Sequence, residues 1–267
     1  MNNTPALAII GGTGVYNPEM LDQVSSISID TPYGAVTCQT GLHAGKSVAF
    51  IPRHGKHHSI PPHLINYRAN IWALKKLGVR QILATTAVGS LNRAMKPGDF
   101  VLPDQFLDFT KLRVSSFYEG GERGVVHVDM TSPYCNELRH IVSSSAKVLN
   151  LSAHNGGCYV CTEGPRFETA AEIRAFEILG GDLVGMTGVP EAVLAREAEM
   201  CYVTVSMVTN FAAGISPDLL THKEVLDTMK QNAANIQALI NQVIETSVSN
   251  DDCVCHHALR EFGGFKL

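Results

Sequence analysis

The sequence lacks the features of exported, membrane-spanning and polymer-binding proteins. Its first residues, Met1–Pro5, carry no basic side chain, and the apolar run after them, Ala6–Ile10, is far too short for a signal-peptide core or a membrane span. Positive charge is not in excess, because the 267 residues have a formal net charge of −4. No repeat, long linker or low-complexity tract is present. We therefore expect a cytoplasmic protein that acts on a small ligand, and neither on nucleic acid nor on a membrane.

The cysteines do not form the pattern of a disulfide framework. There are seven, an odd number, and five of them are spread through apolar, strand-like or irregular segments, where cysteine usually serves as a small buried hydrophobe. Near the C-terminus, the run Cys253–His257 leaves three interpretations open: a soft-metal ligand set, a strained redox disulfide, or part of a frayed tail over residues 249–267.

The chain alternates apolar, strand-like runs with helical segments. Strands are expected at Ala6–Ile10, Ser47–Ile51, Val79–Thr86, Phe100–Leu102, Tyr159–Cys161 and Tyr202–Val208. Helices are expected from Leu64 to Leu77 after the Pro61–Pro62 pair, from Thr169 to Gly180, and from Thr221 onwards with an apolar stripe of Val225, Met229, Ile236, Ile240 and Ile244. Since 45% of the residues are apolar, the pattern predicts an α/β fold with a substantial core and a single domain spanning residues 1–267.

Two loops that follow predicted strands carry groups that bind anions. Gly11–Gly14 is a glycine-rich turn whose backbone N–H groups can converge on a phosphate, with the Thr13 hydroxyl as a further donor. A dinucleotide fingerprint would need a glycine where Asn17 stands, so the Rossmann version of this motif is incomplete. Arg53 and His54 add a permanently charged guanidinium and an imidazole directly after another strand. Together the two loops favour anion binding over a simple surface turn.

The histidines near this second loop do not form a metal-ligand pattern. His54, His57, His58 and His63 are closely spaced, but Pro61–Pro62 separates the last two. No helical pair of histidines there is backed by an acidic residue. We therefore predict that the site contains no metal.

Polar groups recur at the same end of successive strand-like runs, which is typical of an α/β active site. Phe167 and Glu168 follow the run that ends at Cys161, and Asn210 ends a later one. If Glu168 and Asn210 face one purine, the amide fits either a 6-amino or a 6-oxo base, because it both donates and accepts. The Glu168 carboxylate accepts the hydrogen on N1 of hypoxanthine or guanine, but it would face a lone pair in adenine. The pair favours a 6-oxopurine; the alternative is that Glu168 is a helix-terminal charge and Asn210 a turn residue.

The order of these motifs resembles the purine nucleoside phosphorylases and methylthioadenosine phosphorylases of the trimeric type, from Ile9 to about Leu226. The matching segments are Gly11–Gly14, Arg53–Gly55, Thr86–Leu91, Pro97–Asp99, Asp104–Phe106, Glu163–Phe167 and Met186–Glu191. The resemblance implies an α/β/α sandwich around a twisted mixed sheet, assembled as a homotrimer or a dimer of trimers. It also implies phosphorolysis of nucleosides to free base and ribose 1-phosphate, with inorganic phosphate as co-substrate and without a metal or organic cofactor.

The same resemblance assigns roles residue by residue. It assigns phosphate to Thr13, Arg53, His54, Thr86, Ala87 and Thr187, the base to Phe167, Glu168, Asn210 and Ala212, and the ribose to Met186, His222 and, from a neighbouring subunit, His127. Asn210 is the expected catalytic residue.

Departures from the methylthioadenosine branch narrow the expected substrate. Asn210 and Ala212 stand where that branch typically has aspartates, and Glu168 stands where it typically has a serine. His222 matches a histidine that inosine-cleaving relatives present to the 5′-hydroxyl. We therefore expect phosphorolysis of inosine and guanosine, and the alternative is a 5′-methylthioinosine phosphorylase with the same base pocket. Two other classes remain open, a nucleoside-binding protein without catalysis and a dinucleotide-dependent oxidoreductase.

Overall fold

The computed structural model describes residues 4–12, 21–55, 59–216 and 221–267 of the chain. Within these ranges eleven strands form one mixed sheet. The strands are β1 (Leu7–Gly11), β2 (Asp22–Thr31), β3 (Gly34–His43), β4 (Lys46–Pro52), β5 (Gln81–Ser90), β6 (Phe100–Leu102), β7 (Gln105–Phe109), β8 (Ala153–Asn155), β9 (Cys158–Thr162), β10 (Leu183–Gly185) and β11 (Cys201–Phe211). At its centre β4, β1, β5 and β11 lie side by side and parallel, and β2 and β3 extend the sheet beyond β4 as an antiparallel pair.

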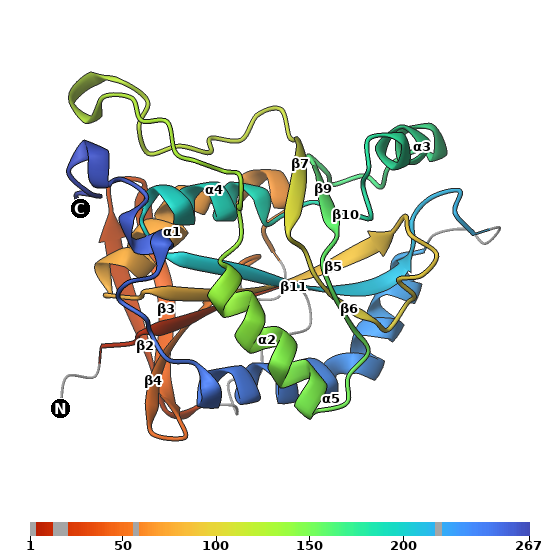
Figure 1. Cartoon of the computed structure of the whole chain (residues 1–267), viewed down its shortest axis with the longest axis horizontal. Coiled ribbons are helices and arrows are strands. Elements are labelled where there is room, and N and C mark those ends of the chain that lie inside the picture. Colours follow the sequence, from red (N-terminus) through yellow and green to blue (C-terminus); the bar gives the residue numbers. More distant parts are fainter. Residues whose placement is uncertain (1–3, 13–20, 56–58, 217–220) are drawn as a thin grey trace.

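Helices cover both faces of the central strands (Figure 1). One face carries α1 (Tyr67–Lys76) and α4 (Val189–Glu197), and the other carries α2 (Asn136–Val148) and α5 (His222–Thr246). Successive residues of a strand point to opposite faces, and β1 accordingly divides its side chains between two cores. Ala8 and Ile10 pack with α1 and α4, whereas Leu7 and Ile9 pack with α2 and α5. The result is the predicted α/β/α arrangement.

Two helix starts follow the capping signals in the sequence. Thr169 and Glu172 form a reciprocal capping box at the start of α3 (Ala170–Ile178). The Thr221 hydroxyl accepts the backbone N–H of Glu224 at 3.2 Å at the start of α5. The predicted apolar stripe of α5 is buried, comprising Val225, Met229, Ile236, Ile240 and Ile244. None of the helices in the described ranges is long and apolar enough to cross a lipid bilayer.

Two local expectations are corrected. The Pro61–Pro62 pair does not open α1 but leads into a short 3-10 turn over Pro62–Leu64. α1 begins at Tyr67, and its N-cap is Asn66, whose side chain accepts a hydrogen bond from the backbone N–H of Ala69. The frayed-tail interpretation also fails. The C-terminal residues form 3-10 turns at Val254–His257 and Arg260–Phe262. They pack on the domain through Cys253, Cys255, Leu259 and Phe265.

The strand β11 is eleven residues long and runs along the full length of β5 at the centre of the sheet. It pairs with β5 in parallel register from Cys201 opposite Gln81 to Val208 opposite Val88. The register then shifts, so that Asn210 lies opposite Gly89. This is a β-bulge at Thr209, a feature that proteins often place beside active sites.

Candidate active site

A cavity of about 420 Å³ lies near the carboxyl ends of the parallel strands β1, β4, β5 and β11. Ligands of α/β sheets bind at this edge, and the volume falls within the roughly 300–1,000 Å³ typical of small-molecule pockets. The lining contains most of the residues expected from the sequence, namely Arg53, His54, Thr86, Ala87, Phe167, Glu168, Met186, Thr187, Asn210 and Ala212. Segments that are far apart in the sequence therefore converge on one cavity.

The guanidinium of Arg53 is buried and paired just after β4. Its Nε and Nη2 donate to the two carboxylate oxygens of Glu191 at 2.5 and 2.9 Å, and its Nη1 donates to the carbonyl of Thr85 at 2.6 Å. Glu191 also accepts from the Tyr202 hydroxyl at 2.8 Å. A guanidinium has five N–H groups, so two remain after these three bonds. Arg53 is therefore held in place, with its charge compensated by Glu191 and two donors left for an anion.

The part of the cavity next to Arg53 also contains a glycine backbone and two hydroxyl groups. A Cβ atom at Gly12, the residue after β1, would lie 2.7 Å from the carbonyl oxygen of Thr85 and 3.0 Å from Arg53 Nη1, so only glycine allows the chain to pass this close to Arg53. The hydroxyl groups of Thr86 and Ser206 are 2.9 Å apart. His54 Nδ1 lies 2.9 Å from the carbonyl oxygen of Ile60, which places the donated proton on Nδ1. This part of the cavity combines a fixed cation with short polar side chains, as a phosphate site requires.

Two hydrogen bonds within β11 set the orientation of the Asn210 amide. Its Nδ2 donates to the carbonyl of Phe211 at 2.9 Å, and its Oδ1 accepts from the Thr209 hydroxyl at 2.7 Å. Because an amide has two hydrogens and two oxygen lone pairs, one of each remains. Asn210 is 4% exposed and lines the cavity. It can therefore donate and accept simultaneously toward a ligand.

The carboxyl group of Glu168 lies in the same cavity, on the segment between β9 and α3. Its Oε1 accepts from the Thr162 hydroxyl at 2.6 Å. Burial raises the pKa of Glu168 above its ordinary value, and the Thr162 hydrogen bond opposes this only in part. In its ionised form the group only accepts hydrogen bonds, so it suits an N–H on the ligand.

Apolar and small residues shape the cavity around Glu168 and Asn210. Phe167 is 41% exposed and contributes an aromatic ring to the lining. A Cβ atom at Gly89 would lie 3.2 Å from Asn210 Nδ2 and 3.3 Å from Val184 Cγ1. Gly89 therefore leaves the space that the Asn210 amide occupies.

Arg113 connects the end of β9 to Met186 in the cavity lining, and it was not predicted from the sequence. Its side chain is 2% exposed. Nη1 donates to the carbonyl of Met186 at 2.6 Å, and Nη2 donates to the carbonyls of Thr162 and Glu163 at 3.1 and 2.7 Å. Arg113 lies in the irregular segment between β7 and α2, where no periodic pattern marks a buried position. Glu191 was also missed as the partner of Arg53, although it ends a recognised motif.

Three expected residues are not placed in this cavity. Thr13 lies outside the described residues, as do His57 and His58. The side chain of His222 is likewise not described, although its backbone opens α5. His127 lines a separate cavity of about 710 Å³, together with Cys135, Arg196 and Phe262. A single chain therefore does not bring His127 to the site.

Comparison with known proteins finds relatives that match almost the whole chain. The family described as "Phosphorylase superfamily" matches residues 6–245. The chain is 54% identical over 261 residues to the 6-oxopurine nucleoside phosphorylase of Pyrococcus furiosus, an alignment that covers 96% of this chain and 98% of that protein. It is 53% identical over 257 residues to the probable S-methyl-5′-thioinosine phosphorylase of Methanothermobacter thermautotrophicus, covering 95% and 89%. A solved methylthioadenosine phosphorylase sourced from an antarctic soil metagenomic library has a TM-score of 0.91 and 39% identity, covering 97% of this chain and 92% of that one.

Proposed function

The chain belongs to the phosphorylase superfamily, and we propose that it cleaves the 6-oxopurine nucleosides inosine and guanosine with inorganic phosphate. The products are the free base and ribose 1-phosphate, which makes the enzyme a pentosyltransferase. The observation that carries the proposal is the placement of an oriented amide, Asn210, and an acceptor carboxylate, Glu168, in one cavity with the buried guanidinium of Arg53.

Recognition of the base uses both polar side chains. The remaining N–H of Asn210 donates to O6 or N7 of the purine, and its remaining lone pair accepts from N7 once that atom is protonated. Glu168 accepts the hydrogen on N1. Adenine presents a lone pair at N1 instead, which leaves the desolvated carboxylate unpaired. Sites built on buried hydrogen bonds reject such mismatched analogues by about 10⁴-fold or more.

The same groups account for the reaction. The bond between C1′ and N9 breaks, and its electron pair leaves with the purine, while a phosphate oxygen forms the new bond to C1′. The hydrogen bonds from Asn210 strengthen as negative charge gathers on the base, which lowers the barrier. Arg53, with Thr86 beside it, positions the phosphate so that its charge faces the cationic sugar. The base takes up one proton as it is released. No metal or organic cofactor takes part in this scheme, and phosphate is the co-substrate.

The alternative, phosphorolysis of 5′-methylthioinosine, shares every base contact and differs only at the 5′ end of the sugar. Val225, on the first turn of α5, lines the cavity with an apolar side chain. A methylthio group gains mainly from such dehydrated apolar contact, whereas a 5′-hydroxyl needs a hydrogen-bond partner such as His222. One of the relatives of similar identity also carries the methylthioinosine name.

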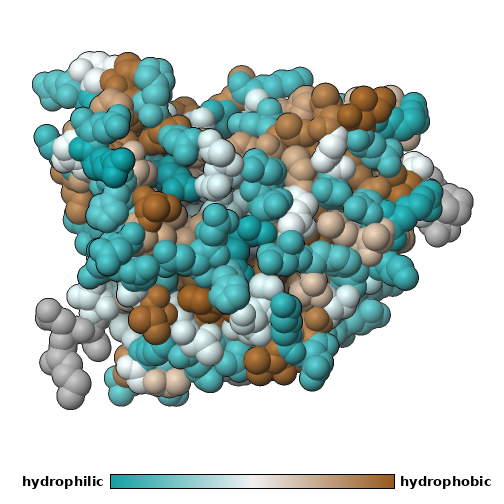
Figure 2. All heavy atoms as spheres, in the orientation of Figure 1, coloured by the Kyte–Doolittle hydropathy of each residue, from teal (hydrophilic) through white to brown (hydrophobic). Residues whose placement is uncertain are grey.

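A homotrimer or a dimer of trimers is the proposed assembly. The end of α3 exposes apolar side chains, with Ile178 at 86% and Leu179 at 56%, and Figure 2 shows hydrophobic side chains gathered over this corner. Such contiguous apolar surface commonly marks a protein contact. In an oligomer, His127 could approach the ribose of a neighbouring subunit.

The proposed enzyme is a single domain that acts in the cytoplasm. The cavity draws on residues from Gly12 to Val225, which supports one domain rather than two. All seven cysteines are free, as is usual in a reducing compartment.

The test is base release followed by ultraviolet absorbance, with and without phosphate, for inosine, guanosine, 5′-methylthioinosine and 5′-methylthioadenosine. We expect phosphate-dependent cleavage that is fastest for inosine and guanosine. Asn210→Ala should lower turnover by about 10²- to 10³-fold, as removal of one transition-state donor does elsewhere, while the protein stays folded. A strong preference for methylthioinosine would select the alternative. Saturable inosine binding without cleavage would exclude catalysis, and cleavage of methylthioadenosine alone would refute the roles of Glu168 and Asn210.

A further inference from the structure

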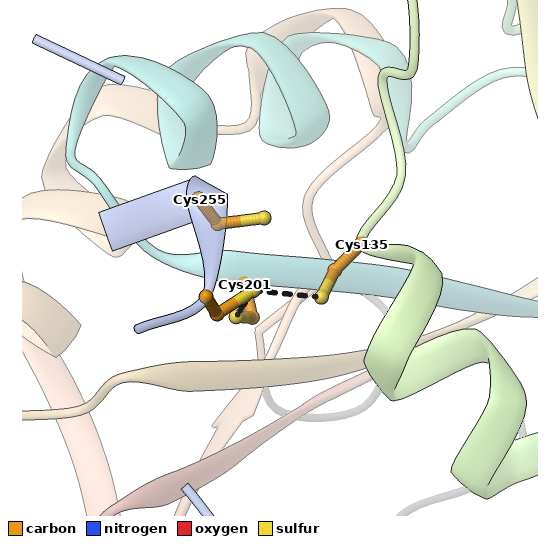
Figure 3. Close-up of side chains that lie close together, drawn as sticks. Cys135, Cys201 and Cys255 are labelled. Carbon is orange, nitrogen blue, oxygen red and sulfur yellow. Dashed lines mark hydrogen bonds between the residues drawn. The ribbon is translucent and has the colours of Figure 1, made fainter. Parts of the chain in front are cut away.

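Four of the seven cysteines gather at one buried point. Cys135 caps the start of α2, Cys201 begins β11, and Cys253 and Cys255 come from the C-terminal segment. Figure 3 shows Cys135, Cys201 and Cys255 from three different elements beside one another. All four are 2% exposed. Their Sγ atoms lie within 4.8 Å of one another, including 3.7 Å from Cys135 to Cys253 and 3.6 Å from Cys201 to Cys253.

The two shorter separations match the spacing of ligands around one tetrahedral metal ion, and the remaining ones exceed it by at most about 1 Å. With a Zn–S distance of about 2.3 Å, the sulfurs of a tetrahedral site lie about 3.8 Å apart. A disulfide would instead bring two sulfurs to about 2.05 Å. We propose that Cys135, Cys201, Cys253 and Cys255 form a structural site for one Zn²⁺ ion. Four thiolates complete the tetrahedral shell, so the ion would keep no open position for a substrate.

The groups around the sulfurs suit thiolate ligands. The backbone N–H of Leu138, in the first turn of α2, donates to Cys135 Sγ at 3.5 Å, and Arg196 Nη1 donates to Cys255 Sγ at 3.5 Å. Zinc with four thiolates carries a net charge of −2. The Arg196 guanidinium and the positive end of α2 both offset that charge.

The proposed zinc site is separate from the chemistry of the cavity. Cys201 and Asn210 lie at opposite ends of β11, and nine residues of strand at about 3.3 Å each place them roughly 30 Å apart. The zinc proposal therefore does not depend on the substrate of the enzyme.

The ion would fasten the C-terminal segment to the domain. Beyond Cys255 the chain buries Leu259 completely and packs the ring of Phe265 against Trp72 at 5.2 Å. The carboxylate of Glu199 accepts the backbone N–H groups of Leu259 and Phe265, each at 3.0 Å. Because the ligands come from three distant segments, the free energy of zinc binding would contribute directly to folding.

The experiment measures metal in the untagged full chain, purified with a thiol reductant and without chelator. We expect one zinc per chain by elemental analysis. After zinc is removed under reductant, Co²⁺ should bind with the visible absorption of a tetrahedral tetrathiolate site. Cys253→Ser should weaken Co²⁺ binding by at least about tenfold, since even supporting residues around a metal contribute that much. Cys158→Ser is the matched control, because this half-buried cysteine lies outside the cluster and should leave binding unchanged.

Three results would overturn the proposal. The first is fully reduced wild-type protein that contains no zinc and binds no Co²⁺, which would make the cluster a packed group of thiols. The second is intact mass showing two disulfides in protein prepared with reductant. The third is equal loss of binding in Cys158→Ser and Cys253→Ser. The wild-type measurements decide the matter even if Cys253→Ser does not fold.

Discussion

Replacing Glu191 with glutamine tests whether the buried Arg53–Glu191 pair is a prebuilt half of the phosphate site. Both side chains are almost inaccessible to solvent, at 0% and 1% exposure. The substitution keeps the shape of the side chain but removes the charge that compensates Arg53. Arg53 cannot lose its proton, so it remains as a buried cation.

The expected loss is large. Breaking a buried ion pair by removing one partner costs about 3–5 kcal/mol. A protein of this size loses about 2–4 °C of melting temperature per kcal/mol, so the melting temperature should fall by roughly 6–20 °C. Phosphate brings the missing negative charge to the two remaining donors of Arg53, and should therefore stabilise Glu191→Gln more than the wild type. Differential scanning calorimetry with and without saturating phosphate measures both effects.

A double variant controls for the loss of packing. Arg53→Met combined with Glu191→Gln removes both charges, and should be more stable than Glu191→Gln alone without responding to phosphate. If Glu191→Gln melted within about 1 °C of the wild type, Glu191 would not be needed to compensate the charge of Arg53. If phosphate raised both melting temperatures equally, the two remaining donors of Arg53 would not bind phosphate in the way we propose.

Three further predictions concern the base side of the cavity. Because the pKa of Glu168 is raised by burial, inosine recognition should be present above that pKa and be lost as the pH falls through it, at a higher pH than for an ordinary glutamate. Glu168→Gln should remove this acid limb from the kcat/KM profile and lower kcat/KM at neutral pH by about 10- to 150-fold, the equivalent of 1.5–3 kcal/mol for a charged hydrogen bond. Gly89→Ala should displace the Asn210 amide and lower kcat while costing about 1–3 kcal/mol in urea unfolding; unchanged kcat would contradict the steric role. Arg113→Lys should lose about 3 kcal/mol of stability and raise KM, because three carbonyls lose a planar partner, and an unaltered KM would confine Arg113 to folding.

The elements that could be predicted from the sequence are those with local signals. The β11 run is apolar and rich in β-branched residues, and α5 has a clear stripe behind Thr221. The helices α2 and α4 have no counterpart among the predicted elements. α4 is buried on almost every side, so it has no clear contrast between a polar and an apolar face. α2 does bury a stripe of Leu138, Val142 and Ala146 at helical spacing, but the three serines Ser143–Ser145 make that signal short.

In the candidate site, too, residues with a local signal could be predicted from the sequence, and long-range pairings could not. Most of its lining residues follow from family motifs and from the repeated position of polar groups at strand ends. Pairings across long sequence separations could not be derived, because nothing local marks them. Glu191 lies 138 positions from Arg53, and Cys253 lies 118 positions from Cys135. The sequence left open whether Cys253 and Cys255 bind a metal or form a disulfide, and only the fold brings Cys135 and Cys201 to them.

The bulge in β11 has a consequence for how substrate preference can change. In a regular strand Thr209 and Asn210 would face opposite sides of the sheet, yet both line the cavity. The amide and the hydroxyl that orients it are thus encoded by adjacent codons. A new base preference could arise from a few neighbouring nucleotide changes in this stretch, while the buried strands on either side keep their packing.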